Sequence, residues 1–175
     1  MTTQQIILWA SAYLIELVAV IYFTRATMRR VLGAVVGGAV AGLLGLGAIA
    51  LCEALGWWQV LFASTPYIMT IFYLGLTISL TPIYLVTWRL ARRFGWRGLA
   101  VFTGIVTIIG APRDYFIASM FPKWMVFAPG VAPLLADALT YAGIVALGHI
   151  AMRLTAGPAG EDRLARQPKA HQQIF

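Results

Sequence analysis

Long apolar stretches, separated by short segments that carry most of the charge, constrain this chain more than any other feature. Five of them cover residues 6–23, 32–52, 67–88, 98 to between 111 and 121, and 131–152. A transmembrane helix needs about 20 apolar residues to cross the ~30 Å of hydrocarbon in a bilayer. The chain is 61% hydrophobic and 11% charged, whereas soluble domains are usually about a quarter charged. We therefore expect an all-α, polytopic transmembrane bundle of five spans over residues 1–153, and a short, partly disordered cytoplasmic tail over 154–175.

The basic residues predict the orientation of these spans. Eleven of the thirteen Lys and Arg residues lie between the first and second spans, between the third and fourth, or after the fifth. Arg113 and Lys123 lie toward the other side. The positive-inside rule then puts the N-terminus outside and the C-terminus in the cytoplasm. We expect a multi-pass protein of a bacterial or archaeal cytoplasmic membrane. Its basic residues flank spans instead of forming a separate patch, so its partner is the lipid bilayer and not nucleic acid.

The fourth apolar stretch is interrupted by Arg113 and Asp114, which directly follow Pro112. A helix that stops at Pro112 is short for a crossing, whereas a helix that continues carries both charges inside the membrane. We favour continuation with a kink, because proline is tolerated in a membrane helix when neighbours satisfy the freed carbonyl. Ionisable side chains at such depth are costly and indicate a functional site.

Polar residues gather in the outer half of the predicted bundle. At 1.5 Å per residue, Arg113 lies ~8 Å and Asp137 ~9 Å below the outer surface. Adjacent residues on a helix do not face each other, so Arg113 and Asp114 each need a partner on another helix. The expectations are a buried Arg113–Asp137 ion pair, an overlapping polar pocket that opens outward, or charges that simply lie in an outer loop. The residues expected to bind a ligand in such a pocket are Arg113, Asp114, Asp137, Glu16, Glu53, Tyr13, Tyr73 and Tyr141.

Glu16 lies near the predicted midplane of the first span. Trp9, Tyr13 and Glu16 are spaced four and then three residues apart, so they share one helix face. An acid at that depth is either a hydrogen-bonded anchor inside the bundle or a proton or cation site.

The second span carries two pairs of glycines four residues apart, Gly33 with Gly37 and Gly38 with Gly42. Small residues at this spacing let two helix backbones approach closely. We expect this helix to be the central, tightly packed one, and a homo-oligomer interface is the alternative.

Several kinds of site are disfavoured by composition. Cys52 is the only cysteine, so an intrachain disulfide and a cysteine metal cluster are excluded. His149 is the one histidine within the spans, whereas a b-type haem bundle needs an axial pair. The spans contain no lysine for a retinal Schiff base. We expect no metal and no cofactor.

One segment, RDYFIASMFPKWMVFAPGVAPLLADALTYAG, resembles the C-terminal signature of bacterial lipoprotein signal peptidases. In that signature an aspartate precedes an aromatic-rich stretch, and a second aspartate follows in an alanine–aspartate dipeptide. The resemblance implies a catalytic aspartate dyad near the outer membrane surface, at Asp114 and Asp137. The chain departs from the family at Pro129, Gly130 and Val131, where an asparagine is expected, and has five predicted spans instead of four.

Three classes of function are compatible with these features. The first is a protein that binds or translocates a small or lipid-like ligand in the outer-half pocket, or a small subunit of a larger membrane complex. The second is an intramembrane enzyme in which Asp114 and Asp137 act as acid and base. The third is a purely structural protein. A guanidinium beside the two acids suppresses the sharing of a proton, so we expect binding in preference to catalysis.

Overall fold

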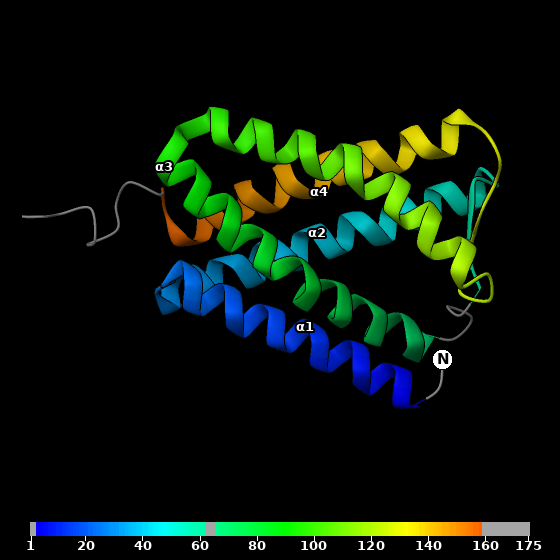
Figure 1. Cartoon of the computed structure of the whole chain (residues 1–175), viewed down its shortest axis with the longest axis horizontal. Coiled ribbons are helices and arrows are strands. Elements are labelled where there is room, and N and C mark those ends of the chain that lie inside the picture. Colours follow the sequence, from blue (N-terminus) through cyan, green and yellow to red (C-terminus); the bar gives the residue numbers. More distant parts are fainter. Residues whose placement is uncertain (1–2, 62–65, 159–175) are drawn as a thin grey trace, which may run out of the picture.

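The computed structural model describes residues 3–61 and 66–158, which form helices, two short strands and the turns that connect them (Figure 1). Its elements are α1 (Thr3–Thr24), α2 (Met28–Ala54), β1 (Trp58–Val60), α3 (Pro66–Met120), β2 (Met125–Phe127) and α4 (Val131–Ala156). The all-α prediction is therefore confirmed. Three helices, Met28–Ala54, Thr70–Met120 and Val131–Ala156, are long and apolar enough to cross a membrane. The predicted tail lies outside the described residues from position 159 onward.

Helix α3 reverses direction at one residue, Gly95. Its φ of 63° and ψ of −153° are non-helical, and only glycine adopts this region readily. Figure 1 shows the two arms of α3 leaving this bend together toward the opposite end of the molecule. The basic segment between the third and fourth apolar stretches is therefore helical on both sides of Gly95. The second arm continues through Pro112 to Met120, as predicted, and Pro112 keeps helical dihedral angles.

Helix α2 packs closely between α3 and α4 through its glycines. A methyl group added at Gly37 would lie 2.6 Å from the carbonyl oxygen of Gly148 on α4. One added at Gly38 would lie 2.5 Å from the carbonyl oxygen of Thr77 on α3. Gly33 likewise faces α4, and Gly42 faces the ring of Tyr73 on α3. All four glycines thus face neighbouring helices of the same chain.

The two strands join the α2–α3 connection to the α3–α4 connection at one end of the bundle. They are antiparallel, with Trp58 opposite Phe127 and Val60 opposite Met125. Glu53, at the end of α2, accepts a hydrogen bond from the Val60 backbone at 2.9 Å. The sequence analysis did not predict these strands, because three residues are too few to show a strand periodicity.

At the other end of the bundle, two arginines donate hydrogen bonds to backbone carbonyls near the ends of α1 and α4. Arg30 is 2% exposed, and its two terminal nitrogens donate to the carbonyls of Gly157 at 2.6 Å and Pro158 at 2.8 Å, just past α4. Its guanidinium also lies over the ring of Trp88, 5.4 Å from the centroid. Arg89 donates to the carbonyl of Thr24 at 2.9 Å. These contacts satisfy carbonyls at or just beyond helix ends that lack partners within the helix.

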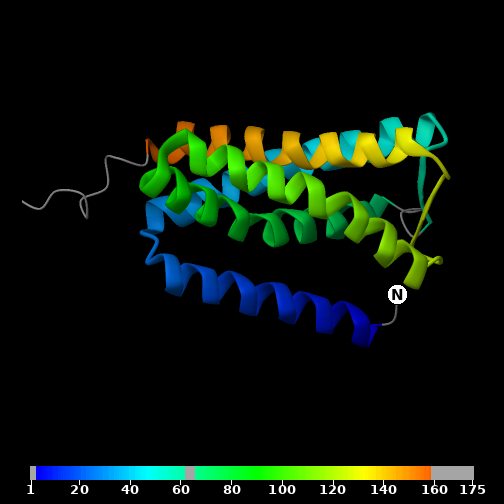
Figure 2. The same cartoon turned by 45° about the horizontal axis from the view of Figure 1, so that its top comes forward.

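Helix α1 is the outermost helix of the bundle (Figure 2). Leu17, Val20 and Ile21 pack against the core, which includes Tyr84, Leu85 and other buried residues of α2, α3 and α4. The other side of α1 exposes large apolar side chains: Leu14, Ile15, Val18, Tyr22 and Phe23. An apolar outer surface of this kind suits contact with lipid.

Candidate functional site

Arg113 and Asp114 form an ion pair with each other on the second arm of α3. The Nε and Nη2 atoms of Arg113 both donate to Oδ1 of Asp114, at 3.1 Å and 2.9 Å. Both residues also have a partner on another helix, Tyr141 of α4, but the expectation that these two neighbours do not pair with each other is wrong. The Arg113 side chain is long enough to turn back along the helix to the adjacent carboxylate. The expected Arg113–Asp137 ion pair is replaced by this local one.

Tyr141 on α4 completes the network from the facing helix. Its hydroxyl donates to Oδ2 of Asp114 at 2.6 Å and accepts a hydrogen bond from Nη2 of Arg113. The Arg113 guanidinium also lies over the Tyr141 ring, 5.6 Å from its centroid. Both carboxylate oxygens of Asp114 are thus occupied, one by an ion pair and one by a hydroxyl. The α3–α4 contact at this level is polar and specific in its geometry.

Gly110 makes room for Tyr141, and the sequence analysis missed it. A methyl group at Gly110 would lie 2.6 Å from the Tyr141 ring. Gly110 precedes Arg113 by three residues and Asp114 by four, so all three share one face of α3. That spacing is visible in the sequence and is the signal that could have identified the residue.

Asp137 lies one helical turn before Tyr141 on α4 and is 5% exposed. Among the described residues, its Oδ2 atom is buried and has no hydrogen-bond partner. The carboxyl group interacts electrostatically with both Asp114 and Arg113. The hydroxyl of Tyr115 is also buried and unpartnered within the described part of the chain, and it interacts electrostatically with Asp137. Buried polar atoms without partners are rare in native structures, so these two need an explanation.

Helix α1 contributes to the same region through Tyr13. This side chain interacts electrostatically with Arg113, Asp114 and Glu16. Glu16 itself is exposed, so the expected polar anchor inside the bundle is wrong for it. The side chain of Trp9, predicted to share this face, lies outside the described residues.

Two of the predicted ligand-binding residues make contacts elsewhere. Glu53 binds the Val60 backbone beside the strands. The hydroxyl of Tyr73 donates to the Ala39 carbonyl on α2 at 3.2 Å, next to Gly42. Of the eight residues expected to line the pocket, the structure brings together Arg113, Asp114, Asp137, Tyr141 and Tyr13. We call these five residues the Asp137 network.

The described residues contain no group of three or more His, Cys, Asp or Glu side chains that could hold a metal ion. The network has instead one carboxylate that is fully engaged and one that retains an unpaired oxygen. Such an oxygen accepts a hydrogen bond from a hydroxyl, an ammonium or a water molecule.

No known protein-family model, curated protein or solved structure matches this chain significantly.

Proposed function

We propose that the chain crosses a bacterial or archaeal cytoplasmic membrane five times, with its N-terminus outside and its C-terminus inside. The basic residues between the spans and after the last one support this orientation. The reversal at Gly95 supports two crossings within α3, whose arms are each long enough to span a bilayer. Reporters fused before Met1, within 121–124 and after Phe175 test the topology. The first two should read outside and the third cytoplasmic. Two termini on one side would contradict five spans.

We propose that the protein binds or translocates a small or lipid-like ligand through the Asp137 network. The observation that carries this proposal is the buried, unpartnered Oδ2 of Asp137, near an Asp114 whose two carboxylate oxygens are both engaged. Leaving a polar group buried without a hydrogen bond costs roughly 1–3 kcal/mol. A ligand that donates a hydrogen bond to this oxygen would recover that cost.

The chemistry of the network indicates the ligand class. Asp137 requires a donor, so the ligand carries a hydroxyl or ammonium group. The hydroxyl of Tyr115, which interacts electrostatically with Asp137, offers a second hydrogen-bonding atom. An apolar remainder suits a site between membrane-spanning helices. Small alkyl amines and alkyl polyols are therefore suitable probes.

Thermal unfolding of the purified protein in detergent, with and without these probes, tests the binding. A donor-bearing probe should raise the melting temperature of the wild type. Asp137→Leu, which removes the acceptor and keeps a similar volume, should abolish the shift. Glu53→Gln is the matched control, because that acid lies outside the network, and it should keep the shift. A shift that Asp137→Leu retains, or wild-type protein that no donor-bearing probe stabilises, would contradict the proposal.

An intramembrane enzyme is the second candidate, favoured by the electrostatic contact between Asp114 and Asp137. A carboxylate dyad works by sharing a proton between its members. Arg113 and Tyr141 already occupy both oxygens of Asp114, which makes that sharing less favourable. If this candidate is right, the purified protein cleaves a lipid-linked or peptide substrate, and Asp114→Asn and Asp137→Asn each abolish turnover without unfolding it. If the network is purely structural, the same changes reduce stability alone.

A further inference from the structure

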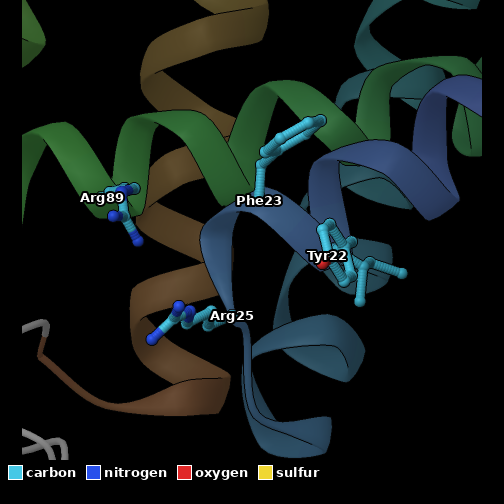
Figure 3. A pocket seen from close by; sticks show the side chains of 5 residues that line it. Tyr22, Phe23, Arg25 and Arg89 are labelled. Atoms are coloured by element: carbon cyan, nitrogen blue, oxygen red, sulfur yellow. The ribbon is translucent and has the colours of Figure 1, made fainter.

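A separate cavity of about 710 Å³ lies where α1 ends, beside the first arm of α3 (Figure 3). It is lined by Ile21, Tyr22, Phe23, Arg25 and Arg89. Arg113 follows the Gly95 bend by 18 residues, or roughly 27 Å of helix. The cavity therefore lies toward the opposite end of the molecule from the Asp137 network, and its chemistry is independent of it.

Two guanidinium groups from different elements line this cavity. Figure 3 shows Arg89 leaving α3 and Arg25 leaving the end of α1, with their guanidinium groups on the same side. The bond from Nη1 of Arg89 to the Thr24 carbonyl fixes that side chain against the last turn of α1. No acidic residue is among those that line the cavity. Two arginines without a carboxylate between them are suited to a phosphate group.

The backbone of Arg25 is a second, independent observation. Ala26 N–H donates to the Ile21 carbonyl and Arg25 N–H to the Tyr22 carbonyl, which is the Schellman pattern at a helix end. Arg25 has a φ of 50°, in the left-handed region where glycine normally ends such a helix. A strained residue that is not glycine points to a role for its side chain. Here that side chain lines the cavity.

The exposed apolar side of α1 continues from this cavity. This apolar surface is formed by Leu14, Ile15, Val18, Ala19, Tyr22 and Phe23, and it shares Tyr22 and Phe23 with the cavity. A cationic site joined to an apolar surface matches a molecule with a phosphate at one end and hydrocarbon at the other. An inorganic phosphate ion has no hydrocarbon with which to contact the apolar surface.

We infer that Arg25 and Arg89 bind the headgroup phosphate of an anionic phospholipid, whose acyl chain lies along the outer face of α1. In the proposed topology these arginines face the cytoplasmic leaflet, where anionic lipids attract basic residues. Charge complementarity selects the headgroup, and the continuous apolar surface selects a lipid in preference to a soluble anion.

Lipid binding to the purified full-length protein, measured by native mass spectrometry, tests this inference. The probes are phosphatidylglycerol, phosphatidylcholine with the same acyl chains, and inorganic phosphate as a competitor. Phosphatidylglycerol should bind several-fold more tightly than phosphatidylcholine, and millimolar phosphate should leave that binding intact. Equal affinity for the two lipids, or full displacement by inorganic phosphate, would overturn the inference.

Two arginine variants distinguish a specific lipid site from a general attraction of anionic lipid to the basic end of the molecule. Arg25→Gly should weaken phosphatidylglycerol binding about tenfold, the scale of one charge-assisted hydrogen bond. Its melting temperature should hold or rise, because glycine relieves the left-handed strain. Arg97→Gln is the matched control, since Arg97 is a cation near the same bend that lies beside Trp96 and does not line the cavity. It should change binding by less than about twofold. Equal losses in the two variants would show diffuse electrostatics and overturn the site.

Discussion

At the scale of single residues, the polar network shows how one long side chain changes its partners. Arg113 reaches the carboxylate beside it in the sequence, and Tyr141 then bridges both charges from α4. The helical wheel correctly separates the directions of the two Cα–Cβ bonds, but it does not describe the reach of a flexible guanidinium. The sequence predicted that Arg113 and Asp114 lie within a helix that continues past Pro112, whereas it did not predict their pairing.

A double-mutant cycle measures this pairing. Arg113→Ala and Asp114→Asn should show a coupling free energy above about 0.5 kcal/mol, because the two side chains share a direct ion pair. Arg113→Ala combined with Asp137→Asn should show a smaller coupling, because those residues interact through space without an ion pair. Reversible unfolding in detergent gives the free energies. A larger coupling free energy between Arg113 and Asp137 would instead support the Arg113–Asp137 ion pair expected from the sequence.

At the scale of elements, α2 shows which glycines matter for packing. The four-residue spacing identified Gly33, Gly37, Gly38 and Gly42 as contact positions, and each faces a neighbouring helix. The sequence could not say which helix each faces, because that depends on how α2 is rotated between α3 and α4. It also could not predict the short β1–β2 pairing, which depends on two connections far apart in the sequence.

Glycine-to-alanine changes on α2 should therefore lower the free energy of unfolding at a packed position and raise it at an open one. Gly37→Ala puts a methyl group 2.6 Å from a backbone oxygen of α4, so the helices must move apart, at a cost of about 1–3 kcal/mol. Gly47→Ala is the control, because nothing lies within 4 Å of its added methyl group. It should stabilise the protein by up to about 1 kcal/mol through helix propensity. Equal effects on the free energy of unfolding would contradict the close approach of α2 to α4.

At the scale of the whole molecule, the two ends are built differently. One end is closed by backbone pairing between β1 and β2. The other is closed by Arg30 and Arg89, which bind carbonyls of neighbouring segments. The sequence predicted that the cations gather at one end. Their role in holding helix ends was not predicted, because it requires knowing which carbonyls lie nearby.

The reversal of α3 depends on Gly95, whose φ of 63° and ψ of −153° strain any other residue. Gly95→Ala should destabilise the fold by roughly 1–3 kcal/mol. Gly104→Ala, in the second arm of the same helix, is the control, because nothing lies within 4 Å of its added methyl group. In thermal unfolding, Gly95→Ala should have a lower melting temperature than Gly104→Ala. A neutral Gly95→Ala would show that the reversal tolerates other backbone conformations.

Because β1 pairs with β2, two fragments of this chain should reassemble after the connection between α2 and α3 is cut. A cut between residues 61 and 66 would leave β1 and α2 on one fragment, and β2, α3 and α4 on the other. The strand hydrogen bonds and the glycine contacts of α2 would then hold two separate polypeptides together. Co-expressed fragments 1–61 and 66–175 should reassemble and co-purify through a tag on either one. Gly37→Ala in the first fragment should reduce the yield of the reassembled protein.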